Sequence, residues 1–379
     1  MFASRSAARR IVERALNEAD VQLNGTRHWD ITVHDDRFFE RVLTHGSLGA
    51  GESYMDQWWD CDRIDDMAYR VLRHGFANNI GSPFRKFLAT AQVLFRDLQK
   101  GQGARRVAQI HYDLPVSLFE AMLGTTMNYS CGYWREAGDL TAAQMSKMEL
   151  ICRKLGLKHG MRLLDIGCGW GGLAHYAATR YSSRVVGITV SDVQANYAVA
   201  KCRDLPVTIH CLDYRDASQN EFGTFDAITS VGMLEHVGPK NYAKFFGVAA
   251  NLLGPDGLLL VQTFGRERSE PIDPWINRYI FPNSYVPSAR ELCDATNGLF
   301  VTEDWHNFGA DYDRTLLAWE ENFERWAEHT WKRTDPRAYR MWRYYLLTFA
   351  AGFRVRDRAQ LWQLILAPRG VPGGYRSIR

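Results

Sequence analysis

The sequence predicts an α/β fold, in which helices cover both faces of a parallel sheet and a small helical domain precedes it. From about residue 160 onward, short apolar strands alternate with helical segments, as is typical of parallel sheets. Before about residue 100, apolar residues recur at helical spacing. The stretch 99–106 is polar, with two glycines and three cations, and indicates a linker. We therefore expect domains over 1–100 and 109–379, joined by residues 101–108.

The N-terminal part begins with an amphipathic helical pattern. Apolar residues recur at helical spacing from Ala8 to Ala19, with charged residues on the other faces. Such a helix can pack on its own domain, which is the common case, or lie on a membrane surface. Further helical patterns follow over 67–72 and 87–98. We read this part as mostly helical.

The later part of the chain supplies the predicted sheet. Its apolar runs predict strands over 162–166, 184–190, 207–212, 225–231 and 258–264. Helical patterns over 173–180 and 191–203 follow the first two strands. Beyond residue 305 the sequence turns helical and aromatic. Ligands of such sheets bind at the carboxyl ends of the strands, so we expect the site there.

Composition limits the class of protein. A net charge of +3 over 379 residues is too small to argue for nucleic acid, although it permits attraction to an anionic membrane surface. No run of about 18 apolar residues occurs, so we expect no membrane-spanning helix. The seven cysteines show no CxxC spacing, so neither a disulfide framework nor a metal site is expected. A reduced, cytoplasmic compartment fits this pattern.

The strongest local signal is a glycine loop that follows the first predicted strand of the sheet. Asp165 ends this strand, and Gly167, Gly169 and Gly171 then allow the backbone to approach a ligand closely before a helix begins. The GxGxG spacing and the preceding acid differ from the GxGxxG turn of dinucleotide-binding proteins. The alternative is a turn with a purely structural role. We interpret the loop as an S-adenosylmethionine-binding loop, which makes the chain a methyl-group transferase.

Polar residues at the ends of the next two strands can complete a cofactor site. Thr189 and Gln194 can bond the hydroxyls of a sugar. In the triplet 213–215, the acid can meet the amine of adenine and the tyrosine can meet its face. The expected cofactor-binding residues are Tyr129, Ser130, Asp165, Gly167, Cys168, Gly169, Gly171, Thr189, Gln194, Asp213, Tyr214 and Arg215.

Several motifs beyond the glycine loop form a recognisable combination. They are His-Tyr-Asp-Leu at 111–114, Met-Asn-Tyr-Ser-Cys-Gly-Tyr-Trp at 127–134 and Ser-Val-Gly-Met-Leu-Glu-His-Val-Gly at 230–238, with further matches at 46–56, 273–277, 279–283 and 304–313. Together they resemble the cyclopropane fatty acid synthases and, more distantly, the mycolic acid cyclopropane synthases. The resemblance covers nearly the whole chain.

This resemblance implies a Rossmann-like S-adenosylmethionine-dependent methyltransferase sheet with a small N-terminal helical domain that contacts lipid and a partner subunit. The implied activity is methylenation of cis double bonds in the acyl chains of membrane phospholipids. The implied partners are membrane phospholipid and a second copy in a homodimer, with no nucleic acid. The implied location is the cytoplasm, peripherally at the inner face of the cytoplasmic membrane.

The resemblance also implies how the reaction ends. Methyl transfer to an alkene leaves a carbocation, and a base must then remove a proton from the new methyl group. In this family the base is held to be a bound bicarbonate ion. Its expected cage consists of Cys131, Glu235 and Tyr312, with the groups at Gln262 and Phe264.

The sequence departs from the family pattern at three positions. Gln262 and Phe264 stand where better-known members carry His and Ile. Gln262 can donate a hydrogen bond to an anion but cannot titrate near neutral pH, and Phe264 can offer only its backbone amide. Phe349 stands where many relatives carry a cysteine once proposed as a nucleophile, so a covalent mechanism through that position does not apply.

Each candidate also has a structural alternative. Cys131 can be an inert buried thiol, Glu235 can brace the following turn, and Tyr312 can be a core aromatic residue. Two functional alternatives remain open as well. One is a C-methyltransferase that gives a methyl-branched or otherwise modified chain, and the other is a lipid- or cofactor-binding protein without turnover.

Overall fold

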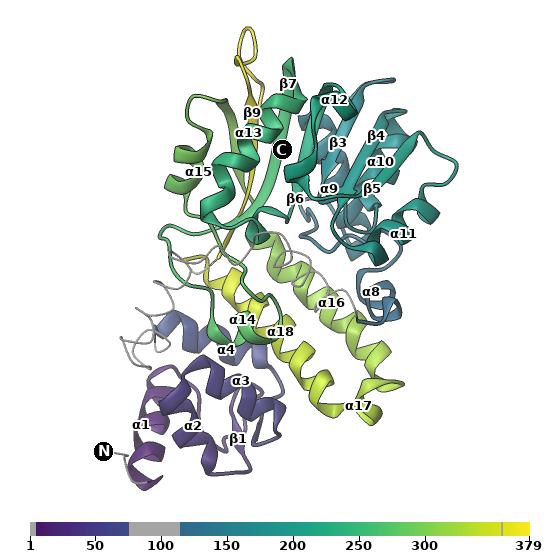
Figure 1. Cartoon of the computed structure of the whole chain (residues 1–379). Helices are drawn as coiled ribbons and strands as arrows, with labels where there is room; N and C mark the ends of the chain where they lie inside the picture. Colours follow the sequence, from purple (N-terminus) through teal and green to yellow (C-terminus); the bar gives the residue numbers. More distant parts are fainter. Residues whose placement is uncertain (1–4, 76–113, 358) are drawn as a thin grey trace. The chain divides into compact units, whose positions relative to one another are not determined.

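The computed structural model describes residues 5–75, 114–357 and 359–379 (Figure 1). The chain forms two compact units, and both are discontinuous in sequence. The first unit contains Met1–Phe95, Pro271–Pro282 and Tyr312–Ala359, and the second contains Arg96–Glu270, Asn283–Asp311 and Gln360–Arg379. The expected linker at 101–108 lies outside the described residues. Two later segments of the chain thus belong with the N-terminal helices, an arrangement that sequence order alone did not indicate.

The first unit is mostly helical, as predicted. Its elements are α1 (Arg5–Glu18), β1 (Thr32–Val33), α2 (Arg37–His45), α3 (Ser47–Met55), β2 (Trp59–Asp60), α4 (Ile64–His74), α14 (Pro274–Tyr279), α16 (Ala310–Glu328, whose first two residues belong to the second unit), α17 (Trp331–Thr334) and α18 (Pro336–Val355). The short strands β1 and β2 pair antiparallel. The helical pattern expected over 87–98 lies outside the described residues.

Apolar burial holds the first unit together. The predicted amphipathic helix is confirmed as α1, which buries Val12 and Leu16 in a core that also contains Trp59 and Leu347. Burial of one large apolar side chain stabilises the fold by about 2 kcal/mol. Since Leu347 lies on α18, the N-terminal helices depend on a partner from near the end of the chain.

A buried carboxylate also joins early and late helices of this unit. Asp65 of α4 is fully buried and accepts hydrogen bonds of 2.9 Å from Arg63 and from Arg354 of α18. Arg354 also donates to Asp66 and Asp313. A buried carboxylate needs such partners because its desolvation costs several kcal/mol.

The second unit contains the sheet. Its helices and strands are α8 (Val116–Leu123), α9 (Leu140–Lys154), β3 (Arg162–Ile166), α10 (Gly172–Tyr181), β4 (Arg184–Thr189), α11 (Asp192–Lys201), β5 (Val207–Cys211), α12 (Gln219–Phe222), β6 (Phe225–Val231), α13 (Tyr242–Leu252), β7 (Leu253–Gly265), α15 (Ala289–Thr296), β8 (Val301–Asn307) and β9 (Gln360–Ala367). The short 3-10 turns η1 (Tyr214–Asp216), η2 (Leu234–His236) and η3 (Pro239–Asn241) follow β5 and β6.

Within the described residues, the sheet has seven strands in the order β5-β4-β3-β6-β7-β9-β8. The five strands from β5 to β7 are parallel, as predicted, whereas β9 runs antiparallel between β7 and β8. Helices lie on both faces of the sheet (Figure 1), and α9 and α10 share an apolar core with β3. The sheet places the ends of β3, β4, β5 and β6 along one edge, where the predicted site residues follow.

The predicted helical C-terminal region is confirmed for α16 and α18, but the expectation of helix is wrong at β9. Strand β8, which begins before residue 305, was not predicted. Residues 361–367 of β9 are all buried. A short, continuously apolar run cannot be distinguished from a buried helical segment by periodicity, which is why this strand was not predicted.

Candidate active site

The glycine loop takes the conformation that its sequence predicts. Gly167, Gly169 and Gly171 have φ angles of +83°, +51° and +76°, in the region that side chains rarely adopt. A Cβ atom at Gly167 would lie 2.8 Å from Met233 Cγ, and one at Gly171 would lie 2.9 Å from Ala198 Cβ. At Gly169 the nearest atom would be Gln194 Nε2, at 4.0 Å, so the backbone there borders open space. A ligand can approach the loop at this point.

The end of β4 lies beside this loop. Thr189 Oγ1 donates a hydrogen bond of 3.0 Å to Gln194 Oε1, and both side chains are buried. Gln194 lies in the first turn of α11, where its backbone N–H donates a hydrogen bond to the N-cap residue Ser191. The structure thus brings Thr189 and Gln194 next to Gly169, as expected for two groups that bind one ligand. Cys168 is buried between these glycines.

The end of β5 carries an acid that already has a partner. Asp213 accepts hydrogen bonds of 2.9 and 2.5 Å from Arg215. Burial acts to raise the pKa of Asp213, but the hydrogen bonds from Arg215 outweigh it and lower that pKa overall. Tyr214 is buried and packs edge-on against Phe245, with ring centroids 5.5 Å apart. Arg215 therefore orients the carboxylate that we expected to meet adenine.

The segment from Thr126 to Cys131 forms a second wall beside the glycine loop. A Cβ atom at Gly172 would lie only 2.4 Å from Thr126 O, so the segment presses against the start of α10. The ring of Phe119 contacts both Tyr129 and Trp170, with centroids 5.8 and 5.3 Å away. These contacts bring the predicted residues Tyr129 and Ser130 to the loop.

Helix α9 holds this segment through two residues that the sequence analysis missed. Gln144 Nε2 donates to Ser130 O at 2.7 Å, and Lys147 Nζ donates to Ser130 Oγ at 2.7 Å. Both side chains are fully buried. Polar residues three apart lie on one face of a helix, so their position on the apolar face of α9 was the available signal.

Burial shifts the pKa values of two ionisable groups near the end of β3. Asp165 is 2% exposed, and desolvation raises its pKa to about 7 although Lys147 acts in the opposite direction. Desolvation lowers the pKa of Lys147 to about 7, while the charges of Cys131 and Asp165 act to raise it. Asp165 on β3 and Lys147 on α9 therefore carry charges that depend on burial and on each other.

Glu235 lies in η2, directly after β6, and is bound to the next strand of the sheet. Its Oε1 accepts a hydrogen bond of 2.6 Å from the backbone N–H of Phe264. Burial raises the pKa of Glu235 to about 7, although the Phe264 amide acts to lower it. Oε2 is buried and has no partner among the described residues. The Phe264 amide, which we expected to be available to an anion, is instead used to orient Glu235.

Gln262 is buried on β7 and pairs with a residue that the sequence analysis did not single out. Its Oε1 accepts a hydrogen bond of 2.9 Å from Gln363 Nε2, because the two residues are register partners on β7 and β9. Gln262 Nε2 is buried without a partner in the described part of the chain. The amide therefore retains a donor for an acceptor that the described residues do not supply.

The two remaining candidates lie in different units. Cys131 is fully buried in the second unit, and its thiol donates to Gly132 O at 3.1 Å. Tyr312 belongs to the first unit, where it stacks on Phe353 at 4.5 Å between ring centroids. The preceding residue, Asp311, accepts a hydrogen bond of 2.7 Å from Trp134 N. The motif at 111–113 lies outside the described residues.

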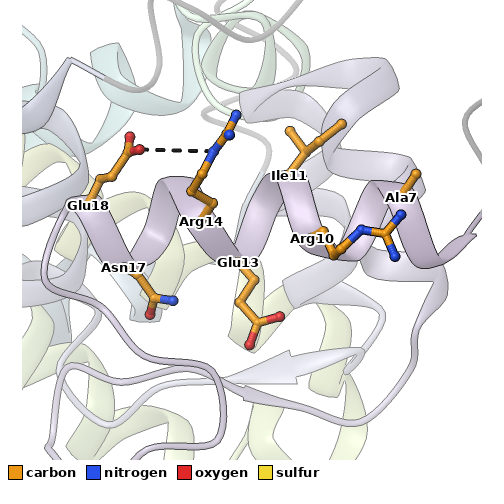
Figure 2. Close-up of a pocket in the computed structure, with 7 residues that line it drawn as sticks. All are labelled: Ala7, Arg10, Ile11, Glu13, Arg14, Asn17 and Glu18. Atoms are coloured by element: carbon orange, nitrogen blue, oxygen red, sulfur yellow. Dashed lines mark ion pairs between the residues drawn. The ribbon is translucent and has the colours of Figure 1, made fainter.

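The first unit also carries a surface pocket along one exposed side of α1 (Figure 2). Its lining residues are Ala7, Arg10, Ile11, Glu13, Arg14, Asn17 and Glu18. Ile11 is 42% exposed, and Arg14 Nε lies 4.0 Å from Glu18 Oε1. The lining contains none of the predicted site residues and is confined to one helix, so we assign it no part in catalysis.

Comparison with known proteins identifies relatives of this chain. Residues 99–364 match the family model for mycolic acid cyclopropane synthetase. The chain is 48% identical to the cyclopropane-fatty-acyl-phospholipid synthase of Escherichia coli strain K12, over 98% of this chain and 96% of that protein. It is 31% identical to the sphingolipid C9-methyltransferase of Komagataella phaffii, over 90% of this chain and 74% of that protein.

Solved structures have a similar fold. A cyclopropane synthase from Mycobacterium tuberculosis aligns with a TM-score of 0.64 and 30% identity, covering 69% of this chain and 98% of that chain. A mycolic acid cyclopropane synthase complexed with SAH and CTAB aligns with a TM-score of 0.64 and 28% identity, covering 69% of this chain and 97% of that chain. The predicted methyltransferase fold is thereby confirmed.

Proposed function

Because this chain belongs to the mycolic acid cyclopropane synthetase family and is an S-adenosylmethionine-dependent methyltransferase, we propose that it modifies unsaturated acyl chains of membrane phospholipids. The proposed reaction adds a methylene group across a cis double bond and forms a cyclopropane ring. The observation that carries this proposal is the 48% identity to a cyclopropane-fatty-acyl-phospholipid synthase over 98% of the chain.

The residues around the glycine loop fit S-adenosylmethionine. The loop leaves open space at Gly169, and Thr189 and Gln194 lie beside it with hydrogen-bonding groups. When bound, S-adenosylmethionine supplies the electrophilic methyl group. We propose that Asp165, Ser130 and the loop hold its amino-acid end and that Asp213 and its neighbours hold its adenine, since these residues end adjacent strands at one edge of the sheet.

The proposed chemistry requires a dry, oriented site. The alkene carbons attack the methyl group, a carbon–carbon bond forms, the carbon–sulfur bond breaks and one alkene carbon becomes a cation. Loss of a proton from the new methyl group then allows the ring to close. Water would capture the cation, so the burial of Cys131, Glu235 and Gln262 supports this reaction.

The unpaired groups beside β7 fit a small anion. Gln262 Nε2 is a buried donor without a partner among the described residues. The raised pKa of Glu235 keeps part of this group protonated near neutral pH, so Oε2 can donate as well. We propose that these groups hold bicarbonate together with Cys131, while Phe264 orients Glu235. Tyr312 belongs to the first unit, and its part in the cage rests on the sequence motif alone. Bicarbonate would supply the base that accepts the proton.

A second outcome remains a candidate because the side chain at 262 cannot titrate. If proton removal from the new methyl group is impaired, the cation can instead lose a proton from a neighbouring carbon of the chain, which gives a methyl-branched chain that keeps a double bond. A relative named sphingolipid C9-methyltransferase has 31% identity to this chain, which makes this alternative specific enough to test.

We further propose that the chain works as a homodimer at the inner face of the cytoplasmic membrane. The exposed side of α1 carries Ile11 and Arg10, which can contact a membrane surface, whereas Arg14 lies beside Glu18 and Glu13 adds a second carboxylate (Figure 2). Among the described helices, none is long and apolar enough to cross a membrane.

The decisive experiment is product analysis. Purified protein is incubated with S-adenosylmethionine and vesicles of a phospholipid with one cis double bond per acyl chain, with saturated vesicles as the control. We expect a mass gain of one CH2 group per modified chain and the upfield proton resonances of a cyclopropane in the product. A methyl-branch spectrum would favour the second candidate, and binding of S-adenosylmethionine without any mass gain would contradict both.

A further inference from the structure

Helix α9 buries two lysines with different surroundings. Lys154 is fully buried, with Nζ 3.4 Å from Asp304 Oδ2 and 3.1 Å from His306 Nδ1. Lys147, two turns earlier, is 1% exposed and donates to the neutral hydroxyl of Ser130 at 2.7 Å. Among the described residues, no carboxylate oxygen lies within 4 Å of Lys147 Nζ. Only Lys154 therefore has the close ion pair that usually accompanies a buried lysine.

A buried lysine at position 147 lowers the stability of the folded protein. Removing an ammonium group from water costs several kcal/mol, and an apolar side chain of similar length would fill the same space without that cost. Stability alone therefore does not account for this residue. Its contacts indicate what it contributes instead.

Lys147 joins two walls of the candidate site. On one side, Lys147 donates a hydrogen bond to the hydroxyl of Ser130. Gln144, one turn earlier on the same helix, donates a hydrogen bond to the carbonyl of that serine. On the other side, Lys147 interacts electrostatically with Asp165 at the end of β3 and with Cys131. One ammonium group thus acts on both the 129–131 segment and the strand that leads into the glycine loop.

We propose that Lys147 is a positioning residue for methyl transfer, which holds the 129–131 segment against the end of β3 and so sets the width of the pocket for the amino-acid end of S-adenosylmethionine. This inference rests on the proposed placement of that cofactor between Ser130 and Asp165. Lys147 acts through these two residues. Without it, the Ser130 hydroxyl loses its donor and Asp165 loses the positive charge that acts to lower its pKa.

The test compares Lys147→Met with Lys154→Met. The control removes an equally buried ammonium group from the same helix, but one that pairs with Asp304. Calorimetry measures the Kd of S-adenosylhomocysteine, and initial rates give the KM for S-adenosylmethionine and for phospholipid vesicles. For Lys147→Met we expect both cofactor constants to rise by about ten-fold or more, which corresponds to about 1.4 kcal/mol, with the KM for vesicles unchanged. For Lys154→Met we expect a lower melting temperature and an unchanged Kd.

Two results would overturn the inference. One is a folded Lys147→Met protein with an unchanged Kd, and the other is an equal loss of affinity in both variants. If Lys147→Met does not fold, hydrogen exchange on Lys147→Gln replaces it. There we expect faster exchange at residues 129–131 and unchanged exchange at 303–307, and the converse for Lys154→Gln. Equal exchange at 129–131 in the parent protein and Lys147→Gln would contradict the inference.

The binding measurements need no lipid, so they separate this inference from the proposed function. A parent protein that binds S-adenosylhomocysteine but does not modify vesicles would contradict the proposed substrate and leave the role of Lys147 to be decided by the Kd values. A protein that makes the cyclopropane product with normal affinity after Lys147→Met would contradict only the role of Lys147.

Discussion

Gln363 Nε2 donates a hydrogen bond of 2.9 Å to Gln262 Oε1 across strands β9 and β7. This bond determines which end of the Gln262 amide is left for a ligand. The oxygen is occupied, so the NH2 group is the end available to an acceptor. A glutamine in this place is therefore a fixed donor, which suits an anion and cannot exchange protons near neutral pH.

The first prediction concerns this pair. In Gln363→Leu, the buried Gln262 oxygen loses its donor, so we expect the free energy of unfolding to fall by about 1–3 kcal/mol. We also expect a fall in turnover, because the Gln262 amide can then rotate and present its oxygen to the anion. Urea unfolding and product formation measure the two effects. In the double variant Gln262→Leu, Gln363→Leu, stability should recover while activity stays low, and a recovery of both would contradict a role for Gln262 in anion binding.

The second prediction concerns the pH dependence of stability at Glu235. Burial raises the pKa of this group from 4.5 to about 7, so the folded state binds the proton more tightly than the unfolded chain does. Its contribution to stability is complete below pH 4.5 and is lost as the pH rises through about 7. The free energy of unfolding of Glu235→Gln, relative to the parent, should therefore increase between about pH 5 and pH 8, by at most about 3 kcal/mol.

Urea unfolding at several pH values measures this difference. Glu221→Gln, at an exposed carboxylate, serves as the control and should give a difference that does not vary with pH. A constant difference for Glu235→Gln as well would mean that Glu235 is ionised in the folded protein, and its proposed role as a donor to an anion would be lost.

The third prediction separates two glycines of one loop. A Cβ atom at Gly171 would lie 2.9 Å from Ala198 Cβ, whereas one at Gly169 would meet only Gln194 Nε2 at 4.0 Å. Both have positive φ, which costs roughly 1–2 kcal/mol for alanine. We expect Gly171→Ala to lose up to about 3 kcal/mol more stability through this clash. We expect Gly169→Ala to lose mainly affinity for S-adenosylhomocysteine, as calorimetry can measure. If both variants lost affinity and stability in the same proportion, the proposed difference between the two glycines would be contradicted.

The fourth prediction concerns neighbouring carboxylates of the first unit. Asp65 is fully buried between Arg63 and Arg354, whereas Asp66 is one-third exposed. We expect Asp65→Asn to lower the free energy of unfolding by about 1–3 kcal/mol, because the hydrogen bonds from Arg63 and Arg354 lose a charged acceptor at a fully buried position. Asp66→Asn should cost less than about 1 kcal/mol. Denaturant unfolding measures the free energy of unfolding of both variants. Equal losses would show that burial of Asp65 does not increase the contribution of its ion pairs to stability.

Local patterns predicted the parallel part of the sheet well. Strands β3 and β6 begin and end at the predicted residues, because their apolar runs are bounded by turn and glycine signals. The glycine loop was also predictable, since positive φ at Gly167, Gly169 and Gly171 demands that residue type. Each of these features depends on residues that are adjacent in sequence.

Features that depend on distant pairing were not predictable. The Gln262–Gln363 contact exists only because β9 pairs antiparallel with β7 in one particular register. The role of Lys147 depends on Ser130, which a loop brings to the buried face of α9. Likewise, helical periodicity identified α18 as a helix but could not reveal that its Leu347 completes the N-terminal core. The reacting groups named from the sequence stay predictions, and sequence reasoning missed Gln144, Lys147 and Gln363, which bond candidate site residues.

The three-segment composition of the first unit has a consequence during synthesis of the chain. Helices α1 to α4 emerge from the ribosome first, but their apolar face is completed by α18, which ends at Val355. The usual order, in which the N-terminal domain folds while later residues are still being made, is therefore closed to this protein. Until α18 has been made, Trp59 lacks the ring of Tyr344, whose centroid lies 6.3 Å away in the folded protein, and the core lacks the side chain of Leu347.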